Sequence, residues 1–96
     1  MAATILVEPD GHDRFRVTVR ERASETVHRV TVPTSYRERL TGGQGSAEEL
    51  VRLSFEFLLE REPKETILPS FELSVIGRYF PEYEGEVKRR LQPSSA

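Results

Sequence analysis

The chain has 96 residues, of which 36% are hydrophobic and 31% charged, and it contains no cysteine. This length fits one domain, 1–96, with a single core, and the lack of cysteine excludes disulfides and thiolate metal sites. With 14 basic and 16 acidic residues, the net charge of −2 gives no overall attraction to nucleic acid or to a membrane surface. We expect an intracellular, cytoplasmic protein, because the first residues lack the basic start and long apolar run of a secretion signal.

Alternating apolar and polar residues in the first third of the chain predict β-strands. The apolar members of two such runs are Phe15, Val17, Val19, Val30 and Val32. We expect an antiparallel hairpin with its turn centred on 23–24, since the apolar side chains then share one face. The expected cross-strand partners are Phe15 with Val32, Val17 with Val30, and Val19 with His28. A short β-prone segment at 4–7 predicts a third strand at the edge.

One long amphipathic helix is expected in the middle of the chain. Ser46 and Glu49 form a capping-box motif, which predicts a helix from residue 47 to about 61, before Pro63. The apolar side chains of this helix cover a very wide arc. A small sheet cannot bury that arc alone, so we expect part of it to meet the C-terminal helices, a second copy of the chain, or both. The arc consists of Leu50, Val51, Leu53, Ser54, Phe55, Phe57, Leu58 and Leu59.

Proline residues divide the remaining helical segments. A short helix at Tyr36–Leu40 and further short helices after Pro63, ending at about residue 91, are expected, with 92–96 as a disordered tail. The predicted fold is therefore α+β. An N-terminal antiparallel sheet of two or three strands, over about 4–32, is followed by one long helix and shorter helices over about 34–91, packed on one face.

The order of elements resembles the ribbon-helix-helix family of dimeric DNA-binding regulators and antitoxins. The matching elements are the strand 27–32, the short helix 34–40 and the long helix 47–61, about 35 residues in all. The resemblance implies that the strand pairs with the same strand of a second copy. It also implies that alternate strand residues, here Arg29 and Thr31, face DNA.

A second resemblance lies further along the chain. The segments 57–65, 67–68, 71–73 and 76–83 look like those of a family of small uncharacterised bacterial proteins of similar length. The resemblance implies a bacterial source and a genuine domain, and it transfers no catalytic residue.

The sequence lacks the common catalytic motifs. The glycines before Ser46 resemble a phosphate-binding loop. That motif needs a lysine followed by serine or threonine, whereas here Ser46 is followed by Ala47 and then by two acidic residues. His12 lies in an Asp-Gly turn, and His28 is expected to be a partly buried neutral imidazole. We therefore expect no enzyme activity, no cofactor and no metal site. A small hydrolase or metal enzyme would need a cleft where His12 or His28 meets carboxylates.

The favoured function is a non-enzymatic protein-interaction module that forms a homodimer or binds another protein. The surplus apolar face of the long helix, or the aromatic C-terminal segment, would form the interface, although the aromatic residues could instead complete the core. The predicted interface residues are Val51, Phe55, Leu59, Tyr79 and Tyr83.

The alternative function is a DNA-binding regulator or antitoxin-like protein of ribbon-helix-helix type. Arginines on the outward face of the hairpin would contact phosphates or base edges, unless neighbouring carboxylates pair with them. The predicted nucleic-acid contacts are Arg14, Arg16, Arg20 and Arg29.

Overall fold

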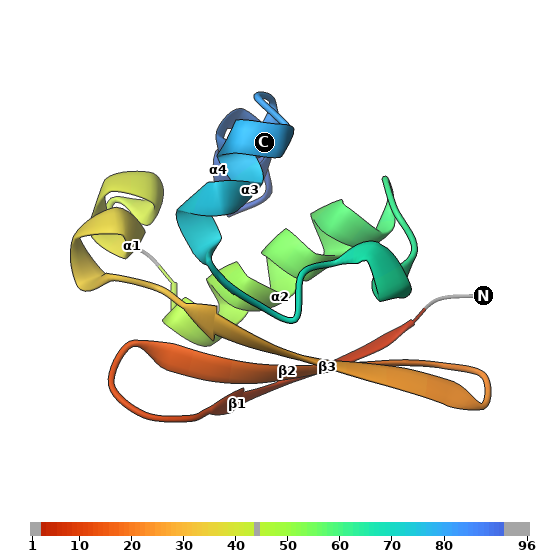
Figure 1. Cartoon of the computed structure of the whole chain (residues 1–96). Helices are drawn as coiled ribbons and strands as arrows, with labels where there is room; N and C mark the ends of the chain where they lie inside the picture. Colours follow the sequence, from red (N-terminus) through yellow and green to blue (C-terminus); the bar gives the residue numbers. More distant parts are fainter. Residues whose placement is uncertain (1–2, 44, 92–96) are drawn as a thin grey trace.

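The computed structural model of the protein describes residues 3–43 and 45–91. These residues form four strands, four α-helices and two short 3₁₀ turns, η1 and η2, so the α+β class is confirmed (Figure 1). The predicted tail at 92–96 lies outside the described residues. The elements in chain order are β1 (Thr4–Pro9), β2 (Arg14–Glu21), β3 (Ser24–Thr31), α1 (Thr34–Thr41), α2 (Ala47–Leu59), η1 (Lys64–Thr66), β4 (Ser70–Glu72), η2 (Leu73–Val75), α3 (Ile76–Tyr79) and α4 (Tyr83–Leu91).

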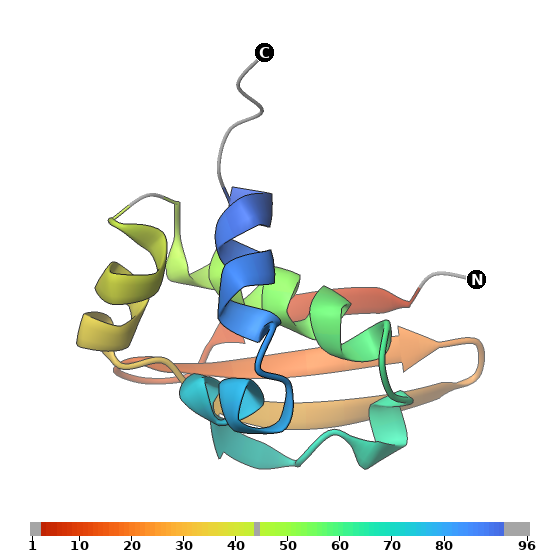
Figure 2. The same ribbon diagram turned by 90° about the horizontal axis from the view of Figure 1, so that it is seen from above.

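The helices cover one face of the sheet. In Figure 1 the strands form the lower layer, α2 lies directly above them, and α3 and α4 lie above α2. Seen from above, α2 runs obliquely over the strands (Figure 2). The opposite face of the sheet carries the exposed side chains of the strands, including Leu6, Arg16 and Arg29. Among the described residues, no helix combines the length and the apolar character needed to cross a bilayer.

The predicted hairpin exists, but its predicted register is wrong by two residues. Val17 lies opposite His28, where the sequence predicted Val30, and Phe15 lies opposite Val30. Glu21 pairs with Ser24, so the turn consists of the two residues between them, with Arg22 at a φ of 53°. A two-residue slip leaves every side chain on its original face, and alternation alone therefore cannot distinguish the two registers.

The sheet gains a strand from a region predicted to be helical. Ser70–Glu72 forms β4, which pairs with β3 in parallel and places Phe71 opposite Val30. The sheet order is β1-β2-β3-β4, so the sheet is mixed rather than antiparallel as predicted. The residue before β4 contributes directly, because the Pro69 carbonyl accepts a hydrogen bond of 2.8 Å from Arg29 N. A strand of three residues is too short for a periodic pattern to reveal it.

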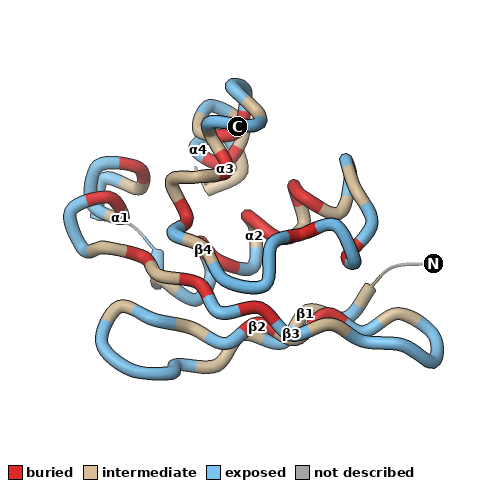
Figure 3. The backbone as a smooth tube through the Cα atoms, viewed as in Figure 1, coloured by how far each residue is buried: buried red, intermediate tan, exposed pale blue. Residues whose placement is uncertain are grey.

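The wide apolar arc of α2 is covered inside the domain. One part of α2 packs on β1 and another on α4, while Ser46 caps the helix as predicted, its Oγ accepting from Glu49 N at 3.0 Å. Figure 3 shows buried segments of α2 facing both the sheet and the C-terminal helices. The only polar buried residue of α2 is satisfied: Ser54 donates to the Leu50 carbonyl and accepts from the Tyr83 hydroxyl, both at 2.7 Å. The buried residues of α2 are Leu50, Val51, Ser54, Phe55, Phe57 and Leu58.

Phe55 tests this account of the core. Its ring is fully buried and lies near His28 and Phe71, with ring centroids 5.3 and 6.0 Å apart. We expect Phe55→Ala to lower the free energy of unfolding by about 3–5 kcal/mol, because it leaves a cavity between α2 and the sheet. Urea denaturation followed by circular dichroism measures this loss. The control Val27→Ala, on the open face of the sheet, should change stability by no more than about 0.5 kcal/mol. A similar small loss for Phe55→Ala would contradict the packing.

Candidate interaction surfaces

The structure separates the predicted interface residues into two groups. Val51, Phe55 and Tyr83 are fully buried inside the domain, so they cannot meet a second copy without unfolding. This corrects the prediction: the helical pattern gives the width of the apolar arc, but not which part of the same chain covers it. Leu59 is half-buried near β1. Tyr79, with 67% of its surface exposed, lies outside the core.

Tyr79 borders an apolar hollow of about 290 Å³. The hollow lies between the C-terminal end of α2, the segment from η1 to β4, and α3. Leu68, 44% exposed, stands at the same hollow, so two of the large exposed hydrophobic side chains border it. We call this surface the Tyr79 patch and define it by Leu68, Phe71, Val75, Tyr79 and Phe80.

A buried histidine holds one side of the Tyr79 patch in place. His28 is 2% exposed, and its Nδ1 lies 2.8 Å from the Leu68 carbonyl oxygen. A carbonyl only accepts, so Nδ1 carries a proton and donates it, and Nε2 lies 2.8 Å from the Thr26 hydroxyl. Both ring nitrogens of His28 therefore have a partner, and His28 fixes the segment before β4 that carries Leu68.

The histidines do not form a catalytic or metal-binding cluster in the part of the chain that the structure describes. His12 is exposed and lies 3.4 Å from Asp13, whereas His28 bonds only to a hydroxyl and a carbonyl. Within residues 3–43 and 45–91, no group of three or more potential ligands could hold a metal ion. Among these residues, neither histidine lies within a cluster of carboxylates.

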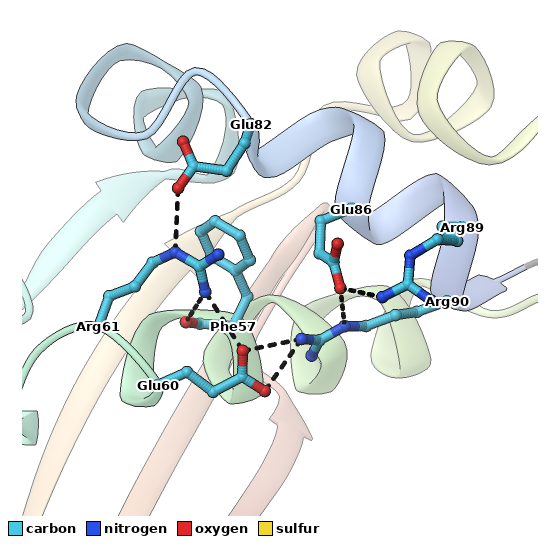
Figure 4. A network of polar contacts seen from close by, with 7 residues as sticks. All are labelled: Phe57, Glu60, Arg61, Glu82, Glu86, Arg89 and Arg90. Carbon is cyan, nitrogen blue, oxygen red and sulfur yellow. Dashed lines mark hydrogen bonds and ion pairs between the residues drawn. The ribbon is translucent and has the colours of Figure 1, made fainter.

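A polar network holds the C-terminal helix against the end of α2 (Figure 4). The Arg61 guanidinium stacks over the Phe57 ring, 3.6 Å from its centroid, and donates to Glu82 at 3.1 Å. Phe57 also makes an edge contact with Phe80, whose ring centroid is 5.8 Å away. Because Glu82 follows α3 closely in the chain, these contacts fix the other side of the Tyr79 patch.

The second half of the network joins α4 to the end of α2. Arg90 donates to both carboxylate oxygens of Glu60, at 2.8 and 2.9 Å, and to Glu86 at 3.0 Å. Glu86 also accepts from Arg89. Hydrogen bonds from Arg89 and Arg90 hold the pKa of the Glu86 carboxyl below its usual value. The ionised form of Glu86 is therefore the one that stabilises the fold.

Glu62 lines the hollow of the Tyr79 patch, and two more charged residues are chain neighbours of its members: Glu72 follows Phe71, and Arg78 precedes Tyr79. Glu62 accepts a hydrogen bond from Thr66 at 2.7 Å, and Glu72 accepts one from Ser74 at 2.8 Å. Arg78, on α3, is exposed. None of these three charges forms an ion pair with another residue that the structure describes. They are available to a charged partner.

The predicted nucleic-acid contacts lie together on the open face of the sheet, and all of them are exposed. Arg16 pairs with Glu8 at 3.2 Å, and Arg20 pairs with Glu25 at 3.1 Å. Arg14 and Arg29 form no ion pair within the described residues, and Arg29 lies directly opposite Arg16.

The ribbon arrangement implied by the resemblance to DNA-binding regulators is not formed. In that family the strand is free to pair with a second copy. Here β3 lies between β2 and β4, so both of its edges are occupied within the chain. The exposed arginines therefore lie on a sheet of a different kind.

Sequence reasoning missed Leu68 and the hollow beside it. Their position depends on β4, which was expected to be helical, and on the contact between His28 and Leu68, which are 40 positions apart. The sequence predicts only short helices after Pro63, whereas the segment that follows Pro69 forms a strand. No local pattern indicates a partner so distant in the chain.

Glu86 gives a pH test of the network that supports the patch. Since its folded-state pKa lies below the ordinary 4.5, the carboxylate stabilises the fold above that pH, and the contribution is lost as the pH falls through the folded-state pKa. We expect Glu86→Gln to lower the urea midpoint at neutral pH and to reduce its fall on acidification. The control Glu38→Gln, on the exposed side of α1, should leave the pH dependence unchanged. Equal pH profiles for wild type and Glu86→Gln would count against the network.

The sequence matches no protein-family profile, and comparisons with curated proteins and with solved structures also give no match. The two family resemblances in the sequence therefore stay predictions.

Proposed function

We propose that this chain is a small non-enzymatic protein-interaction module that self-associates, and that two copies meet through the Tyr79 patch. The observation that carries this proposal is an exposed aromatic side chain beside an open apolar hollow. Tyr79 is 67% exposed, and the hollow next to it has a volume of about 290 Å³. Tyrosine is enriched at the energetic centre of protein interfaces because its ring gives a large contact area at a small cost in side-chain entropy.

A second copy is the favoured partner because the patch carries both a projection and a recess. In a two-fold interface the same surface of each copy meets its equivalent, so each Tyr79 can enter the hollow of the other copy. Large exposed apolar groups grouped at one place are typical of interaction surfaces. Leu68, at the same hollow, would lose its exposure in the same contact.

The charges around the patch also fit a second copy. Arg78 is positive, whereas Glu62 and Glu72 are negative, and these three residues form no ion pair with the described residues. In a two-fold arrangement Arg78 of one copy can face a carboxylate of the other. Charge pairs of this kind set the orientation of an interface more than its strength.

Replacing Tyr79 tests the proposed dimer. We expect wild-type protein to have the mass of a dimer in light scattering across a concentration series, and Tyr79→Asp to be a monomer, because the carboxylate cannot enter an apolar hollow. Tyr79 is exposed, so the free energy of unfolding of the monomer should change by no more than about 0.5 kcal/mol.

The matched control is Val27→Asp, which changes a side chain that is also exposed but lies on the open face of the sheet. This variant should stay dimeric. A wild-type protein that is monomeric at every concentration, or a Tyr79→Asp protein that is still dimeric, would refute the proposal.

The charge pairs allow a further check on the same interface. Arg78→Glu should weaken the dimer by about threefold to tenfold, since it places like charges together. Mixing Arg78→Glu with Glu62→Arg should restore association, and sedimentation velocity measures both effects. If the mixture associates no better than either variant alone, Arg78 and Glu62 do not face each other.

Nucleic-acid binding is the second candidate function. The observation that favours it is the group of exposed arginines on β2 and β3, of which Arg14 and Arg29 form no ion pair within the described residues. Binding of labelled duplex DNA, measured by fluorescence anisotropy, should then fall steeply as salt rises and should weaken in Arg14→Ala and Arg29→Ala. The absence of binding at low salt would exclude this candidate.

A further inference from the structure

The first strand has an outer edge that no other strand of the described residues covers. In the sheet order, β1 is an outer strand, and its one strand neighbour is β2. Natural proteins commonly protect such edges with lysine, an inward charge, a bulge or a proline. From Thr4 to Glu8 the strand has none of these, and Leu6 is 50% exposed; Pro9, which has no N–H, limits the free edge to these residues. Its edge is therefore able to accept another strand.

The hydrogen-bond pattern identifies which peptide groups are free. Asp10 N donates to Arg14 O at 2.8 Å, which marks the position of a hydrogen-bonded pair at the end of the ladder, although the Arg14 N–H itself donates to the Gly11 carbonyl at 3.3 Å. Such pairs alternate along an antiparallel ladder with pairs whose peptide groups point away from each other. Counting back from Asp10, Leu6 is turned toward β2, whereas the N–H and C=O groups of Ile5 and Val7 point to the open edge.

A groove lies beside this edge. Its hollow, about 400 Å³, is bounded by Ala3 and Ile5 on one side and by the C-terminal part of α2, including Leu59, on the other. Helix α2 packs against β1 and passes over it (Figure 2). A strand added to β1 would thus lie alongside α2, and every second side chain would point toward the hollow.

The charges of this groove are mostly negative. Glu21, Glu56 and Glu60 line it together with one cation, Arg52. Glu21 is paired with Lys64, and Glu60 is paired with Arg90. Glu56 and Arg52, one helical turn apart on α2, have no ion-pair partner among the residues that the structure describes.

We infer that the β1 edge and this groove bind an extended, cationic peptide segment of another protein. The segment would pair with the peptide groups of Ile5 and Val7, place an apolar side chain over Ala3, Ile5 and Leu59, and place a lysine or arginine near Glu56. Main-chain hydrogen bonds give affinity in this mode of recognition, and the alternate side chains give specificity. This surface is distinct from the Tyr79 patch.

A defined peptide tests the inference. The probe is a fluorescein-labelled peptide of about seven residues in which lysine and valine alternate, and the comparison peptide has glutamate in place of lysine. We expect saturable binding of the lysine peptide and at least about tenfold weaker binding of the glutamate peptide. Equal binding of the two peptides, or no saturable binding, would overturn the inference.

Amide hydrogen exchange places the peptide on the chain without any substitution. In the free protein the amides of Ile5 and Val7 should exchange faster than those of Leu6 and Glu8, because only the N–H groups of Leu6 and Glu8 point toward β2. On addition of the lysine peptide, Ile5 and Val7 should become protected. Protection at another surface, with no change at Ile5 and Val7, would contradict the proposed site.

Two variants separate the backbone and charge contributions. Val7→Pro removes one outward N–H and keeps the pairing with β2, because that N–H does not point to β2, and it should abolish binding. Glu56→Lys should weaken binding about threefold to tenfold. Tyr79→Asp is the matched control and should bind the peptide normally, whether or not the Tyr79 patch mediates self-association.

The same variants distinguish a second copy as the occupant. If Val7→Pro converts a wild-type dimer into a monomer while the lysine peptide does not bind, the β1 edge is the interface between copies, and the peptide inference is wrong. Peptide binding that is unchanged in both Val7→Pro and Glu56→Lys would also reject it.

Discussion

The rest of the structure depends on one constraint. Helix α2 must bury one side on the sheet and another side on the C-terminal helices. Its apolar arc is too wide for a single contact, so the chain must supply two covering layers. Phe55 packs toward the sheet, near His28 and Phe71. Tyr83 packs from the other layer and bonds to Ser54. The layers lie in this order because both apolar sides of α2 must be covered.

Two contacts between distant parts of the chain convert this core into defined surfaces. His28 bonds to the Leu68 carbonyl and fixes the segment that leads into β4. Arg61 stacks on Phe57 and bonds to Glu82, which fixes the segment after α3. The Tyr79 patch lies between these two anchors, so an exposed aromatic side chain stands on a rigid support. Such preorganisation lowers the entropy cost of binding.

The proposed surfaces use different physical means of recognition. The Tyr79 patch offers an apolar projection and a recess, with charges of both signs around it, which suits a copy of the same surface. The β1 edge offers unpaired peptide groups beside a mostly acidic groove, which suits an extended cationic segment. Because the two lie on different elements, α3 and β1, both can be occupied in one molecule.

Sequence patterns by themselves determined the α+β class, the two hairpin strands and the start of the long helix at Ser46, since these depend on local periodicity and capping; they left the edge strand open. Tertiary structure alone decided the hairpin register, because a two-residue slip leaves every side chain on the same face of the sheet. It also decided β4, which is too short for a pattern and depends on β3 as its partner. Above all, the tertiary structure decided which apolar residues lie at the surface. Phe55 and Tyr79 look alike in a helical pattern, but Phe55 is buried between α2 and the sheet, whereas Tyr79 is exposed.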